Sequence, residues 1–508
     1  MSCESTSESL TKVAGHAASW QIFGGIWTTI VRIGASVFLA RLLTPEDFGV
    51  FGMSLLAYEL ISAVAAMGMG AGIIARKNVS DIDLCTCFWS MAAVRFFMFC
   101  GCFFGAPLAG AFFDNHLLVD VIRVISFTFL ISILEVVSAA LLTKELKFKT
   151  INMIQGITVL IESVFAVLLA SFTDLGYWSL VYAMLINSTI TSVSLFVLAG
   201  WRPKFKFSKE SFKYLFNFGA NSLGFSFMNY LSNNLDYLLV GKTLGARALG
   251  LYEFAYRIPH IIQLRLVQPI GSTLFPTLSK VQDDNEKLLN GYLKTVQFLC
   301  LIAFPMLGGL ATLADNLVLL LWGEQWVEII VPLQILCLCA ALRVVPQSVG
   351  AILFCKKRPD IPFKLSFVSL IWTAICVGIF GVMFGITGVA WGMVLSTIPQ
   401  YFSIYFAFRL IDKKTFIVLV ALKPVVWSTL AMLVVVFTAK SLLLSFALHD
   451  AVILLSCIVA GVIVYTLCLF TFFTEFSKDK LDILGEVAGI DLTSKLQWLF
   501  IGSEKLRN

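Results

Sequence analysis

Charged residues are scarce in this chain of 508 residues. Asp, Glu, Lys and Arg make up 13% of it, against 59% for hydrophobic residues, whereas an average soluble domain is about 25% charged. Too few polar side chains remain to cover a water-exposed surface, which excludes a soluble globular protein. The net charge of +6 comes from bases spread over short loops, which excludes the concentrated basic patch of a nucleic-acid-binding protein. We therefore predict a polytopic membrane protein with no nucleic-acid partner.

Histidine is also scarce, and the side chains that catalysis or metal binding usually needs form no recognisable set. The sequence has 4 histidines and 12 cysteines, and it contains no P-loop, no Gly-rich dinucleotide turn and no metal-spaced cluster. Pairs such as Cys85/Cys87 point their side chains about 200° apart on a helix, so we interpret them as small buried hydrophobes. We predict that the protein is not an enzyme and has no catalytic residue, metal or cofactor.

Long apolar runs fill most of the chain. A spanning helix needs roughly 20 apolar residues, and this rule gives about fourteen spans. Helices are expected because the strands of a membrane barrel would alternate polar and apolar residues, so the predicted fold class is all-α. The predicted spans lie near 17–40, 50–74, 84–108, 117–142, 151–172, 177–200, 214–240, 250–275, 291–313, 329–354, 363–384, 389–410, 418–445 and 451–473.

Two turns in the chain resemble each other. Leu39–Phe51 (LARLLTPEDFGVF) aligns with Val240–Tyr252 (VGKTLGARALGLY), with Phe48–Phe51 on Leu249–Tyr252. An even number of predicted spans separates them, which is typical of parallel repeats related by an axis along the membrane normal. We therefore predict two parallel six-helix bundles around a central cavity, followed by two C-terminal helices.

The loops predict the orientation of the chain. The loop segments that would face the cytoplasm carry most of the Lys and Arg residues, and those on the opposite side at 173–176, 314–328 and 385–388 carry none. This bias places both termini in the cytoplasm. The predicted segments are an N-terminal six-helix bundle (1–200), a basic cytoplasmic linker (201–213), a C-terminal six-helix bundle (214–410), two additional transmembrane helices (411–475) and a cytoplasmic amphipathic tail (476–508).

Several charged residues fall inside predicted spans, although each costs about 2.5 to 3.5 kcal/mol to insert at the bilayer centre. Arginine binds phosphate oxygens through two parallel hydrogen bonds, and carboxylates or histidine can take up protons. The candidates for holding an anion such as pyrophosphate in the cavity are Arg32, Arg257, Arg95 and Arg343. The candidates for ion coupling are Glu59, Asp236, Glu253 and His260.

The same charges have a purely structural alternative, which is ion pairing between or along helices. Glu253 and Arg257 are four residues apart on one helix face, and Arg32 could pair with Glu59. Pro259 lies beside the first pair and permits a kink there. The asparagines in the run from 217 to 234 are interpreted mostly as hydrogen-bonding partners between helices.

The chain resembles a known family at this point. Ala40–Phe51 is similar to the first loop of Wzx-like bacterial polysaccharide-unit flippases, a branch of the MOP exporter superfamily. Asn234–Tyr252 resembles the start of the second half of the same proteins, and Phe275–Ser279 with Val281–Asp284 resembles the cytoplasmic end of their eighth helix. The resemblance extends from near residue 15 to near residue 475, and its motifs are structural.

The resemblance implies movement of an undecaprenyl-pyrophosphate-linked oligosaccharide from the cytoplasmic to the outer leaflet by alternating access. The product would be O-antigen, capsule or exopolysaccharide, and the location would be the bacterial inner membrane. Expected partners are the lipid-linked oligosaccharide, membrane lipid, and polysaccharide polymerase or export machinery. The related peptidoglycan-precursor flippase uses arginines on its first, second and eighth helices. Arg32 and Arg257 match the first and eighth by helix, whereas the second carries Glu59.

Two other functions compete with flipping. A cation-coupled exporter of drugs or metabolites, from a sister branch of the superfamily, would have a cavity dominated by acidic residues. A membrane-embedded polymerase or ligase would need an extended outward loop carrying catalytic groups, and no outward loop here is that long.

Overall fold

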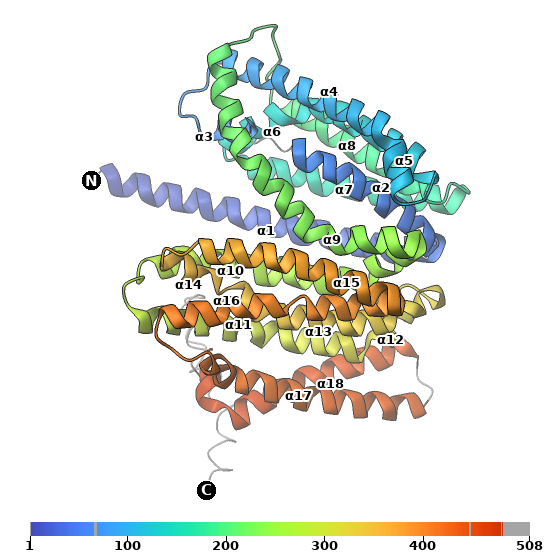
Figure 1. The fold of residues 1–508 in the computed structure, drawn as a ribbon, viewed down its shortest axis with the longest axis vertical. Coiled ribbons are helices and arrows are strands. Elements are labelled where there is room, and N and C mark those ends of the chain that lie inside the picture. Colours follow the sequence, from blue (N-terminus) through green and yellow to red (C-terminus); the bar gives the residue numbers. More distant parts are fainter. Residues whose placement is uncertain (1, 66–68, 447–448, 479, 481–508) are drawn as a thin grey trace. The chain divides into compact units, whose positions relative to one another are not determined.

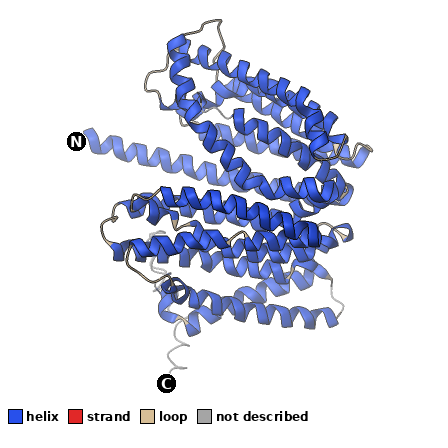
Figure 2. Ribbon diagram, viewed as in Figure 1, coloured by secondary structure: helices blue, strands red, loops and turns tan. Residues whose placement is uncertain are grey.

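The computed structural model describes residues 2–65, 69–446, 449–478 and 480. Within these ranges every regular element is a helix, as Figure 2 shows. Ten helical stretches among the described residues are long and apolar enough to cross a membrane. The prediction of an all-helical chain with many spans is therefore confirmed, whereas the predicted tail lies almost entirely outside the described residues.

The chain divides into two compact units, Met1–Gly250 and Leu251–Asn508 (Figure 1). The elements of the first unit are α1 (Ser2–Leu42), α2 (Pro45–Ala65), α3 (Met69–Ala75), α4 (Asp81–Phe112), α5 (Leu117–Ile131), a 3-10 turn (Ser132–Leu134), α6 (Glu135–Lys144), α7 (Phe148–Phe172) and α8 (Trp178–Leu198). The division falls inside the long helix α9 (Lys209–Ile262).

The second unit begins with the last part of α9. Its further elements are a π-helical turn (Gln263–Val267), α10 (Gln268–Ser279), α11 (Asn285–Thr312), α12 (Ala314–Leu321), a 3-10 helix (Glu324–Ile329), α13 (Ile330–Gln347), α14 (Gly350–Cys355), α15 (Asp360–Leu395), α16 (Ile398–Leu410), α17 (Phe416–Ser445) and α18 (Asp450–Phe472). Within this unit α17 packs on α18, and α11 packs on both α13 and α17.

Two predicted loops between spans are sharp kinks at a glycine, where two helical segments join directly. The turn expected after residue 240 is a break at Gly245 in α9, where φ is +84°. The turn expected near 385–388 is a break at Phe384 and Gly385 in α15, where φ of the glycine is +61°. Glycine reaches positive φ at no steric cost, so one residue can redirect the chain without a loop.

The first turn between spans is set by local hydrogen bonds. α1 ends at Leu42 and α2 begins at Pro45, whose fixed φ suits the first position of a helix. Thr44 and Asp47 form a reciprocal cap: the Thr44 amide donates to Asp47 Oδ2 at 2.9 Å, and the Asp47 amide donates to Thr44 Oγ1 at 3.3 Å. Asp47 Oδ1 also accepts from the amide of Tyr177 at 3.1 Å, which ties this turn to the start of α8.

The two turns that resemble each other in sequence touch each other in space. A Cβ on Gly49 of α2 would collide with the carbonyl oxygen of Ala246, and a Cβ on Gly250 would collide with that of Pro45. In the sequence alignment Gly49 corresponds to Gly250 and Pro45 to Ala246. The contact is therefore reciprocal, and it brings the backbones of α2 and α9 closer than any side chain would allow.

A compact apolar cluster holds one end of the first unit together. Met69 and Ile73 of α3 pack with Phe88 of α4, Val137 of α6 and Leu215 of α9. Elsewhere in this unit α1 lies along α7, and α4 lies beside α5 (Figure 1). These contacts position the polar groups described next.

Candidate functional site

Arg32 lies in the C-terminal half of α1 and faces α7. Its Nη2 is 3.8 Å from Oε2 of Glu162, and the two side chains are 65% and 24% exposed. The expected pairing with Glu59 is therefore wrong, because α1 packs along α7 and not along α2. At 3.8 Å the contact is a long ion pair, so the arginine fork keeps hydrogen-bonding capacity for another anion.

Glu162 is held from a second helix as well. Asn187 of α8 donates from Nδ2 to Oε2 of Glu162 at 2.6 Å. Thr191 Oγ1 lies 3.0 Å from Oδ1 of Asn187 and 3.1 Å from Oγ1 of Thr158. A polar chain thus crosses from Arg32 through α7 to α8 inside predicted spans. Sequence reasoning placed Glu162 in a span but did not include it among the site candidates.

Arg95 belongs to a separate polar cluster in the first unit. It is half-buried in α4 and interacts electrostatically with Glu135, at the start of α6, and with Tyr58 of α2. The ring of Tyr58 packs on Phe129 with centroids 4.6 Å apart. Within the described residues the partners of Arg95 differ from those of Arg32, so the two arginines lie in different surroundings.

The predicted ion-coupling residues of the first unit lie in different settings. Glu59 is exposed on α2, whereas Asp236 of α9 is only 3% exposed. The charge of Glu59 acts on the hydroxyl of Tyr230, which donates to the carbonyl of Leu56 at 2.6 Å. This hydrogen bond fastens α9 to α2 one turn away from Glu59.

Arg257 and Glu253 form the ion pair expected along one helix. Arg257 Nη2 lies 2.6 Å from Oε1 of Glu253, with the side chains 25% and 31% exposed. The guanidinium also lies over the ring of Phe254, 4.2 Å from its centroid. The predicted i, i+4 pairing is confirmed, and it is a much closer contact than the pair made by Arg32.

Tyr256 links the two remaining candidates of the second unit. Arg343 of α13 donates to the Tyr256 hydroxyl at 3.0 Å and to Ser396 Oγ at 3.2 Å. The His260 ring stacks on the Tyr256 ring with centroids 5.1 Å apart, and the charge of Arg343 acts on His260. The structure thus brings four candidates of the second unit together around about two turns of α9: Glu253, Arg257, His260 and Arg343.

The helix does not break at Pro259. Its helical conformation continues to Ile262 and then widens into the π-helical turn Gln263–Val267. The expected irregularity beside the charges is therefore present, but it takes the form of a π turn one step later. Gln263 donates from Nε2 to the carbonyl of Ala340 at 3.1 Å, which joins this turn to α13.

The asparagines of α9 do not bridge helices where the structure describes their contacts. Asn233 donates from Nδ2 to Oδ1 of Asn229 at 3.1 Å, and Asn234 donates to the carbonyl of Tyr230 at 3.1 Å. Both contacts lie within one helix at i, i+4. The interpretation as interhelical partners is wrong for these residues, because both side chains find acceptors on the preceding turn of their own helix.

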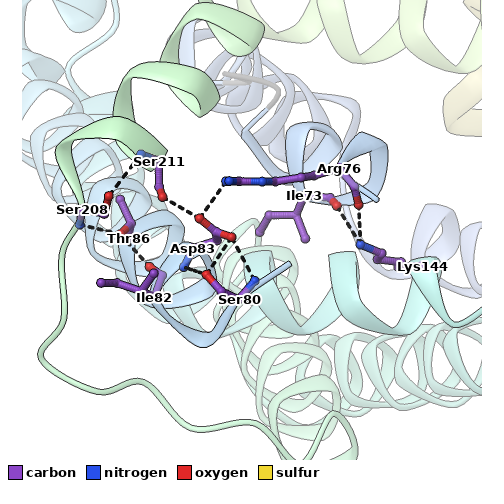
Figure 3. A network of polar contacts seen from close by, with 9 residues as sticks. All are labelled: Ile73, Arg76, Ser80, Ile82, Asp83, Thr86, Lys144, Ser208 and Ser211. Atoms are coloured by element: carbon purple, nitrogen blue, oxygen red, sulfur yellow. Dashed lines mark hydrogen bonds and ion pairs between the residues drawn. The ribbon is translucent and has the colours of Figure 1, made fainter. Parts of the chain in front are cut away.

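A network centred on Asp83 was not expected from the sequence (Figure 3). Asp83, the third residue of α4, is 3% exposed and accepts from Arg76 Nη1 at 2.7 Å and from Ser80 and Ser211. Ser211 opens α9, so the carboxylate joins residues 128 positions apart. The amide of Ser208 also donates to Thr86 Oγ1 at 3.0 Å.

The basic loop before α9 is fixed on the start of α4 by the same kind of contact. Lys204 Nζ lies 2.9 Å from Asp81 Oδ2, and this hydrogen bond raises the pKa of Lys204. Trp201 donates from Nε1 to the other oxygen of Asp81 at 3.1 Å, and Trp89 donates to the carbonyl of Lys204 at 3.0 Å. The segment predicted as a linker is therefore packed against the first unit.

Comparison with known proteins identifies the family. Residues 38–331 match the model of a family described as polysaccharide biosynthesis protein. The lipopolysaccharide biosynthesis protein WzxC of Escherichia coli is 33% identical over 397 residues, which are 75% of this chain and 80% of that protein. The teichuronic acid biosynthesis protein TuaB of Bacillus subtilis is 26% identical over 70% of this chain and 74% of its own length.

The fold is similar to that of a solved transporter. The lipid II flippase MurJ, in an inward closed conformation, superposes with a TM-score of 0.74 over 89% of this chain and 98% of its own, at 15% identity. At 15% identity, the likeness to MurJ shows a shared fold. The sequence matches to the family model and to WzxC show the family. The chain belongs to the polysaccharide biosynthesis protein family.

Proposed function

We propose that this protein is a flippase that moves an undecaprenyl-pyrophosphate-linked oligosaccharide unit from the cytoplasmic to the outer leaflet. The observation that carries the proposal is the combination of a sequence match to lipopolysaccharide and teichuronic acid biosynthesis proteins with the fold of a lipid II flippase. The glycan built from the exported units would be O-antigen, capsule or exopolysaccharide.

The proposed membrane arrangement is finer than the fold described above. It has fourteen spans, formed by two parallel six-helix bundles at 1–200 and 214–410 and two additional helices at 411–475, in the bacterial inner membrane. Both termini lie in the cytoplasm, as the distribution of Lys and Arg over the loops supports. Polysaccharide polymerase or export machinery would receive the flipped unit.

The ion pairs within the spans supply a way to exchange one anion for another. Arg32 is largely exposed and holds Glu162 only at 3.8 Å, so a pyrophosphate offering two oxygens to the guanidinium competes well with that carboxylate. Glu162 stays in place through Asn187. Once released from Arg32, it becomes available to a proton or a cation.

Arg257 supports the same exchange in the second unit, with Glu253 as the displaced carboxylate. Arg95 and Arg343 are further candidates for the substrate phosphates, and Glu59, Asp236 and His260 are further candidates for ion coupling. Adding Glu162 to the second group gives each unit an arginine paired with an acidic residue. Binding of the substrate phosphate to the arginine then favours binding of a proton or cation to the released carboxylate, and by linkage the bound ion favours substrate binding to the same extent.

The experiment is a deletion strain in which lipid-linked oligosaccharides are extracted and assigned to a leaflet. The wild-type gene restores glycan export, whereas Arg32→Ala and Arg257→Ala lower the export rate at least about tenfold, since each loses a charged contact to phosphate. Arg202→Ala is the matched control, because the described contacts of this exposed arginine are with the carbonyls of Phe196 and Trp201 and with the ring of Phe196, and none is with a carboxylate.

Complete units accumulating on the cytoplasmic side in the deletion strain are the expected result. Full restoration of export by both alanine variants would refute the role of the two arginines. Normal glycan export with altered dye resistance would refute the flippase itself and favour a drug or metabolite exporter. Units that reach the outer leaflet but fail to lengthen would point to a polymerase.

A further inference from the structure

A cavity of about 440 Å³ opens at the end of the first unit where α3, α4 and α6 meet. Lys77 and Asn78, in the loop between α3 and α4, form one wall, and Lys144 and Glu145, at the end of α6, form the opposite wall. Its remaining lining is apolar and comes from Val79, Leu84 and Leu141. The chain offers this cavity two ammonium groups, one amide, the carboxylate of Glu145 and a hydrophobic floor.

The positive charge of this cavity is not balanced by the protein. Within the described residues neither Lys77 nor Lys144 has a carboxylate within ion-pair distance, whereas the two neighbouring acidic groups are occupied. Glu145 pairs with Lys147 at 2.6 Å, and Asp83 pairs with Arg76 at 2.7 Å. Two unmatched cations facing one cavity attract an anion.

The cavity is also held in a fixed shape. Lys144 Nζ donates to the carbonyl of Arg76 at 2.6 Å and to that of Ile73 at 3.4 Å, so it caps the end of α3 and keeps one N–H to spare (Figure 3). Asp83 fixes Arg76 and Ser80 on either side of Lys77 (Figure 3). The loop that carries Lys77 is therefore fastened at both of its ends.

Neighbouring aromatic residues indicate the depth of this cavity in the membrane. Trp89 and Trp201 both donate from their indole nitrogens to groups of the basic loop and of α4. Tryptophan is enriched at the level of the lipid headgroups. The loops around the cavity are those assigned to the cytoplasmic side, where anionic headgroups attract Lys and Arg.

We propose that this cavity binds the phosphate of a lipid headgroup, with Lys77 and Lys144 on the phosphate oxygens and the apolar floor against the start of the acyl or prenyl chain. Two lipids carry this chemistry: an anionic phospholipid, with a phosphodiester, and the lipid-linked substrate, with a pyrophosphate. Binding of the lipid-linked substrate rests on the proposed function, whereas binding of an anionic phospholipid does not.

The test uses the full-length protein in a neutral detergent and follows its thermal unfolding during ligand titration. The probes are dioctanoyl phosphatidylglycerol, geranyl pyrophosphate, inorganic pyrophosphate and, as a zwitterionic comparison, dioctanoyl phosphatidylcholine. Lys77→Glu is the main variant, because Lys77 is exposed and has no described role in folding. Lys213→Glu is the control, because this exposed lysine makes the same charge change outside the cavity.

Lys77→Glu is expected to raise the Kd for the anionic probes about tenfold or more, since a charge-assisted contact becomes a repulsion. Lys213→Glu is expected to leave the Kd within about twofold. Asn78→Ala provides a milder variant of the same wall. Tighter binding of phosphatidylglycerol than of geranyl pyrophosphate assigns the cavity to phospholipid, and the reverse order assigns it to the substrate.

The proposal is overturned if Lys77→Glu and Lys213→Glu weaken binding equally, because the anions would then be attracted by the overall positive charge of the protein surface and not by this cavity. It is overturned as well if no anionic probe stabilises the wild-type protein more than phosphatidylcholine does. Because binding is measured without transport, failure of the flippase assignment in the deletion strain would leave the phospholipid result unaffected.

Discussion

Asp83 shows what one buried carboxylate contributes to this fold. Replacing it by Asn removes the charge that Arg76 faces and leaves donors of Ser80 and Ser211 poorly matched. We expect Asp83→Asn to cost about 2 to 3 kcal/mol of unfolding free energy, measured as a lower Tm in detergent. Asp174→Asn, on an exposed loop, should cost less than about 0.5 kcal/mol. Equal Tm values for the two variants would contradict the role of the network.

The residues that sequence reasoning selected were charged groups inside apolar runs, and the structure gives each a setting that spacing alone could not. Spacing along one helix predicts Glu253 with Arg257 correctly, because both lie on the same face. The partner of Arg32 depends on which helix packs beside α1, and that is a tertiary fact. Glu162 was therefore missed as a site residue, and so was the Asp83 network, whose ends are 128 positions apart.

Lys440 fastens one of the two additional helices. Its Nζ lies 2.5 Å from Asp315 Oδ1 and 2.9 Å from the carbonyl of Thr312, and its side chain is 11% exposed. We expect Lys440→Met to lower the unfolding free energy by about 2 kcal/mol, since Asp315 and a carbonyl lose their donor. Lys423→Met, on an exposed position of the same helix, should change it by less than about 0.5 kcal/mol. Thermal unfolding of both variants decides the point.

The crossing of α2 and α9 depends on the absence of side chains. Gly49→Ala would place a Cβ against the carbonyl of Ala246, so we expect a loss of at least about 2 kcal/mol in detergent unfolding. Gly101→Ala is the matched control within a helix, because nothing lies within 4 Å of its added Cβ. Alanine favours a helix over glycine by about 0.5 to 1 kcal/mol, so this control should stabilise. Changes of the same sign in both variants would contradict the close contact.

The ends of helices were predictable where the sequence changes from apolar to polar residues, and unpredictable where both sides of a junction are equally apolar. Runs of about 20 apolar residues locate the spans, because lipid demands that length. The junctions at Gly245 and Gly385 were expected as loops, since hydropathy does not distinguish a loop from one residue with positive φ. The pairing of α1 with α7 had no sequence signal, because both spans are mostly apolar and hydropathy does not tell which helix packs beside which.

At the scale of the whole chain, the asymmetry of basic residues predicts a topology that labelling can test. We expect Lys206→Cys to react with a membrane-impermeant maleimide only after permeabilisation, and Asp174→Cys to react in intact cells, because these exposed loops lie on opposite predicted sides. The unmodified protein supplies the background, which should be low since most of its described cysteines are buried. Reaction of both variants in intact cells would invalidate the predicted orientation.

The reciprocal contact between the two similar turns has the geometry of an isologous interface inside a single polypeptide. In a symmetric dimer, residue i of one copy meets residue j of the other and the reverse also holds. Gly49 with Ala246 and Gly250 with Pro45 satisfy that relation after the repeats are aligned. A half-length protein carrying only one copy of this turn would therefore present a self-complementary surface to its own twin. When both copies lie in one chain, their sequences can differ at other positions of the contact. Gly49 and Gly250 are the exception, because a Cβ on either would collide with the facing carbonyl.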